Sequence, residues 1–150
     1  MKIRNITFIL GLAVFSSLST ISALPAFAQT TTEVAVVEAV KTVENQEFFK
    51  KKYRIKGTWS LTERDGKHFI TFSDDFKTKN GPDLKIFLSP KSTADVNGKN
   101  AIDGAVNIGV LKSNKGSQEY EIPADVNLSQ FSTVLVHCEA YSILWGGGAL

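Results

Sequence analysis

The stretch GTWSLTERDGKHFITF, residues 57–72, predicts the fold class of this chain. Two runs in which apolar and polar residues alternate lie on either side of Asp65 and Gly66. An Asp-Gly pair between two such runs is the strongest short-range signal for a β-hairpin. Because side chains alternate between the two faces of a strand, this pattern buries one face of each strand. The stretch therefore predicts an antiparallel hairpin that contributes one face to a core.

More strands are predicted after this hairpin. LKIFLS, residues 84–89, follows a turn at residues 80–83 and places Leu84, Ile86 and Leu88 on one face. Residues 90–104 are polar and rich in turn formers, which predicts a loop. AVNIGVLKS at residues 105–113 and QEYEIP at residues 118–123 follow as two strands.

The C-terminal part of the sequence completes the pattern. ADVNLSQF, residues 124–131, predicts a single helical turn, and FSTVLVHCEAYSILW, residues 131–145, predicts one long final strand. The run Gly146 to Gly148 is not followed by a helix that could bind a phosphate, so we interpret it as a flexible chain end. Strands spaced in this way predict an all-β fold, a single small β-sandwich or barrel-like domain.

The N-terminus indicates export. Lys2 and Arg4 precede an apolar segment, Ile6 to Phe15, and small residues lead to an AxA-type cleavage site that ends at Ala28. These three features predict a signal peptide at residues 1–28 and a periplasmic or secreted mature protein. An uncleaved membrane anchor is the alternative, although serines and threonines after the apolar segment shorten it. The sequence contains no second candidate membrane span.

Composition changes after the predicted signal peptide. Residues 29–47 contain no Gly, Pro or aromatic residue, and their apolar members are only Val and Ala. We therefore predict a linker there, with a frayed amphipathic helix as the alternative, and the β domain at residues 48–150.

Charge gives little indication of a nucleic-acid partner. The chain has 17 Lys and Arg residues against 15 Asp and Glu residues, and Lys2 and Arg4 lie in the segment predicted to be removed. The mature chain is then formally neutral, which argues against a nucleic-acid-binding protein. Lys50, Lys51, Lys52, Arg54 and Lys56 form the one basic cluster, which we interpret as a solvated entry to the first strand.

Few residues in the chain carry reactive side chains. Cys138 is the only cysteine, so no disulfide can form within the chain, and there is no CxxCH motif for covalent c-type haem. The motifs of metalloproteases, α/β-hydrolases and phosphate-binding loops do not occur, so we expect no stand-alone catalytic activity. His68 and His137 are the only histidines.

Strand parity separates Cys138 from its neighbour. Cys138 shares a face with Val134, Val136 and Ala140, whereas Leu135, His137, Glu139 and Tyr141 point the other way. His137 therefore cannot act as a base for Cys138 in a regular strand, and only His68 or a bulge could bring an imidazole to the sulfur. The apolar face favours a buried structural cysteine.

A cation site is a weaker hypothesis. Asp74, Asp75 and Asp83 could offer oxygen ligands to a hard cation, but their spacing fits no Ca²⁺ loop, so turn chemistry is favoured. The identity of any metal stays open.

Two long stretches resemble the electron-transfer DM-thirteen domain family: HFITFSDDFKTKNGPDLKIFLS, residues 68–89, and NIGVLKSNKGSQEYEIPADVNLSQFSTVLVHCEAYSILWGGGAL, residues 107–150. The blocks that carry the resemblance are Asp75-Phe76 leading into GPDL, the IGVLK segment, and a terminal strand with a cysteine. The resemblance implies a small β domain that works in electron-transfer chains through this cysteine, here Cys138. The sulfur would act as a bare thiol or as ligand to a prosthetic group such as haem. In this chain His137 stands where the family often has an aromatic residue.

Two functions from different classes follow. The first is an exported accessory domain of a redox process in the cell envelope, with Cys138 as the redox or ligand residue and His68 and His137 as weaker candidates. Its partner would be an envelope or extracellular protein. The second is a non-catalytic binding or adhesion module in which Cys138 is structural.

Overall fold

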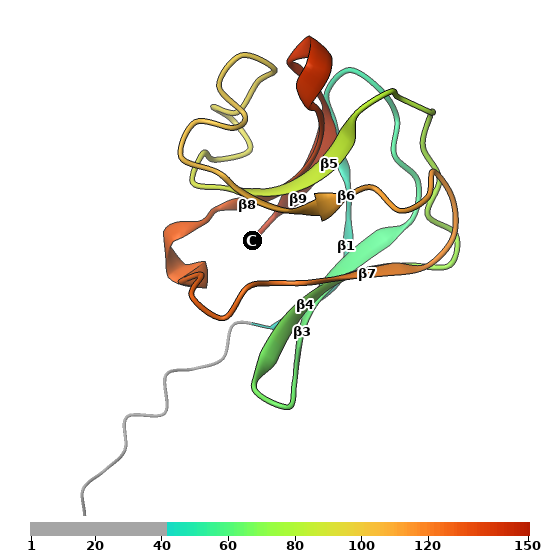
Figure 1. Ribbon diagram of the computed structural model, residues 1–150. Helices are drawn as coiled ribbons and strands as arrows, with labels where there is room; N and C mark the ends of the chain where they lie inside the picture. The colour runs from blue at the N-terminus through green and yellow to red at the C-terminus, as the bar shows by residue number, and fades with distance from the viewer. Residues whose placement is uncertain (1–41) are drawn as a thin grey trace, which may run out of the picture. The chain divides into compact units, whose positions relative to one another are not determined.

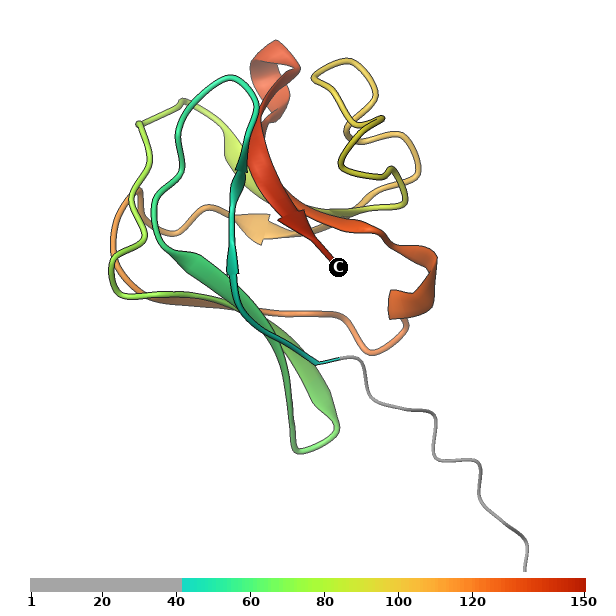
Figure 2. The same ribbon diagram turned by 180° about the vertical axis from the view of Figure 1, so that it is seen from behind.

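The computed structural model describes residues 42–150 and shows an all-β domain of two antiparallel sheets. One sheet has four strands in the order β1-β3-β4-β7, formed by β1 (Val43–Glu47), β3 (Thr58–Arg64), β4 (Lys67–Phe72) and β7 (Gln118–Glu121). The other has five in the order β2-β9-β8-β5-β6, formed by β2 (Phe49–Lys50), β5 (Leu84–Ser89), β6 (Val106–Val110), β8 (Thr133–Cys138) and β9 (Ile143–Ala149). Figures 1 and 2 show the two layers from opposite sides. The predicted β-sandwich is confirmed.

The hairpin that predicts the fold forms as expected. β3 and β4 pair in continuous register from Trp59 opposite Phe72 to Arg64 opposite Lys67. The two residues between the strands, Asp65 and Gly66, both have positive φ, which is the backbone of a type I′ turn. This turn matches the twist of the strands, so the Asp-Gly pair fixes the register of the hairpin.

The main core lies between the two sheets. The hairpin contributes Trp59, Leu61, Ile70 and Phe72, all of which are completely buried. The facing sheet contributes mainly the inward positions of its central strands, including Leu84, Ile86, Leu88, Val134, Val136 and Trp145. Leu84, Ile86 and Leu88 of β5 therefore lie on the same buried face of the strand, as predicted.

A smaller core covers the outer face of the five-stranded sheet. It contains Phe87, Leu135 and Leu144 from the strands, together with Val96 and Ala101 from the segment between β5 and β6. That segment has no strand, as predicted, but it packs on the sheet because it buries these two side chains.

The predicted linker is wrong at its C-terminal end. Residues 43–47 form β1, which pairs with β3 from Val43 opposite Leu61 to Glu47 opposite Thr58. After Phe48 the chain continues as β2 in the other sheet, so Phe48 lies where the chain passes from one sheet to the other. The alternation that marks a strand is absent because β1 is an edge strand with only Val43 partly buried. The predicted signal peptide and the rest of the linker lie outside the described residues.

The predicted long final strand is interrupted. β8 ends at Cys138, the short 3-10 helix η2 (Glu139–Tyr141) follows, and Ser142 takes a left-handed conformation before β9. Asp83 holds this turn, because its carbonyl accepts the N–H of Glu139 and its carboxylate accepts the N–H of Ala140. The predicted helical turn forms as η1 (Leu128–Gln130).

The C-terminal glycines are not a flexible end. Gly146 to Gly148 lie in β9 between β8 and β2, and a Cβ at Gly148 would lie 1.9 Å from Nε1 of Trp59. A Cβ at Gly147 would lie 2.2 Å from the carbonyl oxygen of Val134. The glycines are required here because the backbone and the indole come too close for any side chain.

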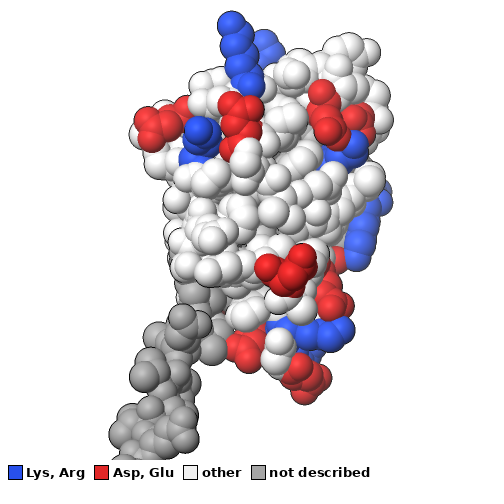
Figure 3. Space-filling view, turned by 60° about the vertical axis from the view of Figure 1, so that its left-hand side comes forward, with Lys and Arg blue, Asp and Glu red and all other residues white. Residues whose placement is uncertain are grey.

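The surface carries charges of both signs. On the face drawn in Figure 3 acidic and basic side chains gather towards the upper and lower ends, around an uncharged middle. Across the four-stranded sheet, Arg64 pairs with Glu119 at 2.9 Å and Lys67 pairs with Glu121 at 2.8 Å.

Candidate redox site around Cys138

Cys138 is the last residue of β8 and points into the main core. It lies opposite Leu84 of β5 and opposite Ile143 of β9, and only 2% of its surface is exposed. Its thiol is free. Val134 and Val136 share its face, as predicted, but Ala140 does not because the strand has ended. The site is a small, apolar and closely packed environment for sulfur.

His137 lies on the other side of the same strand. It is completely buried, and its ring meets Phe87 edge-on with centroids 6.0 Å apart. Neither ring nitrogen has a hydrogen-bond partner within residues 42–150. Burial lowers the pKa of His137, and the nearby charge of Glu139 opposes this shift. Burial thus favours the neutral imidazole, and because the ring points to the face of β8 opposite the sulfur, it cannot serve Cys138 as a base.

His68 is also separated from Cys138. It lies on β4 in the four-stranded sheet, opposite Glu63, and is partly exposed. Cys138 lies in the five-stranded sheet. The structure therefore brings none of the three candidate residues into a common site.

A charged cluster that the sequence did not indicate lies beside the end of β8. The ammonium of Lys85 pairs with the carboxylates of Glu139 and Asp83, the latter at 3.3 Å. The hydrogen bond to Glu139 is the main cause of the raised pKa of Lys85. This cluster and the backbone contacts of Asp83 close the turn that follows Cys138.

The three aspartates considered for a cation do not form a site. Asp83 is paired with Lys85, and Asp75 accepts a hydrogen bond from Ser73 at 2.6 Å. Within residues 42–150 no group of three His, Cys, Asp or Glu side chains is arranged to hold a metal ion. The structure thus favours a role for these residues in stabilising turns.

An aromatic pair connects the core with the surface. Trp145 belongs to the same buried cluster as Cys138, and its ring meets Tyr53 at a centroid distance of 4.6 Å. Tyr53 is partly exposed, and the ammonium of Lys79 lies 5.0 Å from its ring. Sequence reasoning missed this pair because Tyr53 lies outside any regular strand.

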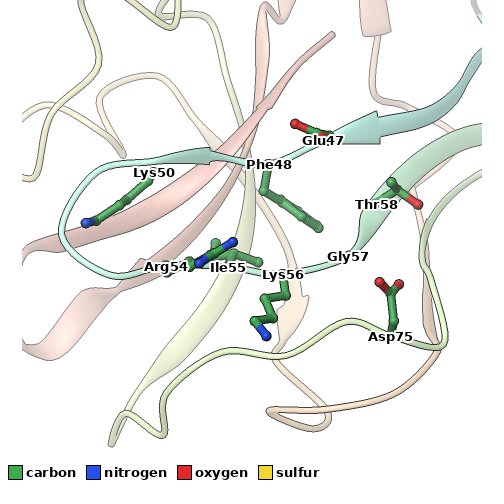
Figure 4. Close-up of a pocket in the computed structure, with 9 residues that line it drawn as sticks. All are labelled: Glu47, Phe48, Lys50, Arg54, Ile55, Lys56, Gly57, Thr58 and Asp75. Carbon is green, nitrogen blue, oxygen red and sulfur yellow. The ribbon is translucent and has the colours of Figure 1, made fainter.

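The surroundings of Cys138 do not fit a haem group. Buried side chains of the main core fill the space on the sulfur side of β8, and His137 points to the opposite face. A pocket of about 620 Å³ opens at Phe48 and Ile55 and does not include Cys138 among its lining residues (Figure 4). A planar macrocycle at the sulfur would require this part of the core to be rebuilt.

No helix within residues 42–150 is long and apolar enough to cross a membrane.

Comparison with known protein families identifies the family of this chain. Residues 47–147 match the model of a protein family described as Electron transfer DM13. No curated protein and no solved structure matched the chain. The matched region runs from the end of β1 into β9 and contains Cys138. Because it covers most of the chain, the chain belongs to the electron transfer DM13 family.

Proposed function

We propose that this protein is an exported accessory domain of an electron-transfer process in the cell envelope, and that it acts through Cys138 as a thiol. The observation that carries the proposal is the position of the only cysteine, in the matched region and one residue before an exposed turn. Family membership supports a redox-related role, and no other described side chain offers a sulfur for it.

Access to the sulfur is through the turn after β8. Tyr141 in η2 is 66% exposed, and Ser142 holds a left-handed backbone that costs free energy for a residue with a side chain. Short segments of this kind open locally at less cost than the sheet itself. Local opening of η2 would bring Cys138 to solvent while the sandwich stays folded.

The burial of Cys138 favours a second candidate, a non-catalytic binding module with a structural cysteine. A thiol among Val134, Val136 and Leu84 packs as a small apolar side chain.

Alkylation of Cys138 tests the two candidates. If the thiol acts in redox chemistry, an alkylating reagent should modify the folded chain at a rate set by local opening, well above the rate of global unfolding. Tyr141→Gly should raise this rate, because it loosens η2. A modification rate that equals the unfolding rate measured separately would leave only the structural role.

Export is the part of the proposal that rests on the N-terminal sequence. Lys2, Arg4, the apolar segment and the small residues before Gln29 support a cleaved signal peptide and a periplasmic or secreted protein. Intact mass of the exported protein should correspond to a chain that begins at or near Gln29. Recovery of the uncleaved chain in the membrane fraction would contradict export as a free domain.

A further inference from the structure

Three segments that are distant in sequence bring lysines side by side. Lys56 and Lys77 exchange two backbone hydrogen bonds, of 2.9 and 3.2 Å, and Lys77 also forms an antiparallel bridge with Lys115. Residues that are directly opposite in antiparallel pairing carry their side chains on the same face. Lys56, Lys77 and Lys115 therefore form a row, and all three are exposed.

This row has a cost in the free protein. Like charges directly opposite one another destabilise antiparallel pairing. Among residues 42–150 none of the three lysines forms an ion pair, whereas Arg64, Lys67 and Lys85 do. Packing requires only the alternate positions Phe76 and Thr78, which are buried. Folding therefore does not explain why all three outward positions are lysine.

More cations surround the row. The ammonium of Lys79 lies over the ring of Tyr53. Thr78 donates a hydrogen bond to the carbonyl of Arg54, so the chain around Arg54 lies against residues 77–79. Lys50 also lies nearby, on the rim of the pocket that Lys56 and Arg54 line. We call this set the basic surface: Lys50, Arg54, Lys56, Lys77, Lys79 and Lys115.

A pocket of about 620 Å³ lies at one side of the basic surface and is lined by three of its residues, Lys50, Arg54 and Lys56. Figure 4 shows Lys50 at the end of β2 and Arg54 and Lys56 on the segment that leads to β3, with Glu47 and Asp75 on other segments around the hollow. Phe48 and Ile55 give the pocket an apolar part. The cations outnumber the two carboxylates in this lining, and a hollow with cations along one side can receive a side chain that projects from a partner, which a flat charged surface does not provide.

We propose that the basic surface docks an acidic protein partner, whose carboxylate side chains pair with the lysine row and, at the edge of the pocket, with Lys50, Arg54 and Lys56. Complementary charge steers such encounters and fixes their orientation. The hollow favours a protein over the flat surface of a lipid bilayer. The inference does not depend on the chemistry of Cys138.

Binding of a poly-L-glutamate peptide to the full chain tests the proposal. The peptide should bind at low salt and weaken as salt screens the charges. In the triple variant K56Q/K77Q/K115Q the affinity should fall by about tenfold or more. This variant should melt at or above the temperature of the wild type, because the repulsion within the row is removed, so loss of binding would not reflect unfolding.

A matched variant controls for net charge. K67Q/K91Q/K99Q removes the same number of charges outside the basic surface and should bind the peptide within about twofold of the wild type. An equal loss of affinity in both variants would overturn the proposal, because binding would then follow net charge alone. Tighter binding to phosphatidylglycerol vesicles than to the peptide, lost in K56Q/K77Q/K115Q, would also overturn it in favour of a membrane.

Discussion

At the scale of single residues, His137 is the side chain whose position is hardest to reconcile with stability. Among residues 42–150 its two buried ring nitrogens have no hydrogen-bond partner, and burying an unpaired polar group costs free energy. Its ring faces Phe87, and the strand neighbours opposite it are Lys85 and Leu144. Protonation of the ring would add a buried charge to this cost.

His137 should therefore make the stability of the protein depend on pH. The pKa is 6.5 for an ordinary histidine and lower for buried His137, so the unfolded chain binds more protons as the pH falls below 6.5. The proton-linked contribution of His137 to the free energy of unfolding is fully present above pH 6.5 and is lost progressively as the pH falls below this value. His137→Leu should be at least as stable as the wild type at pH 7 and gain relative to it towards pH 5, as measured by urea unfolding.

His68→Gln is the control for this measurement. His68 lies partly exposed in the other sheet, so its replacement removes a histidine without altering the surroundings of His137. A parallel pH dependence in wild type and His137→Leu would show that His137 has the same pKa in the folded and unfolded chains, against this account.

Gly148 provides a second residue-scale prediction. Gly148→Ala should lower the free energy of unfolding by about 3 kcal/mol or more, because the new methyl group would overlap the buried indole of Trp59. Gly66→Ala meets open space and is strained only by its positive φ, so it should cost about 1 kcal/mol. Equal losses in the two variants, by urea unfolding, would mean that Trp59 does not pack on Gly148.

At the scale of elements, β1 is an edge strand that covers β3. It contributes a partly buried Val43, a ladder with β3, and a hydrogen bond from the N–H of Asn45 to Ser60. A chain that begins at Phe48 should be less stable than one that begins at Thr42 by about 2 kcal/mol. Thermal unfolding of the two truncated chains measures this difference. Equal melting temperatures would restore the interpretation of residues 43–47 as a linker.

The turn between β8 and β9 shows why some elements could not be predicted. The apolar pattern through residues 131–145 continues across η2, so periodicity alone predicts one strand. What ends β8 is Asp83, more than fifty residues earlier, whose backbone and side chain hold the N–H groups of Glu139 and Ala140. Such a contact leaves no local signal in the sequence.

At the scale of the whole molecule, the sandwich was predictable because the hairpin at residues 57–72 and the alternation at Leu84, Ile86 and Leu88 are local patterns. The face of Cys138 was also predictable from parity within β8. The glycine run was not, because its role depends on Trp59 in the opposite sheet. The lysine row was not either, since Lys56, Lys77 and Lys115 meet only in the folded chain.

The central claim is that Cys138 exchanges electrons in the folded protein, and anaerobic titration with ferricyanide tests it most directly. The Cys138 thiol gives its proton to solvent and one electron to ferricyanide, which leaves a thiyl radical, and two such radicals combine into a disulfide between two chains. The folded wild-type chain should reduce ferricyanide, whereas folded Cys138→Ala, which leaves only a small cavity, should reduce none. The account would be contradicted if the folded wild type reduced no more than Cys138→Ala while the urea-unfolded wild type did, because Cys138 would then be a packing residue only.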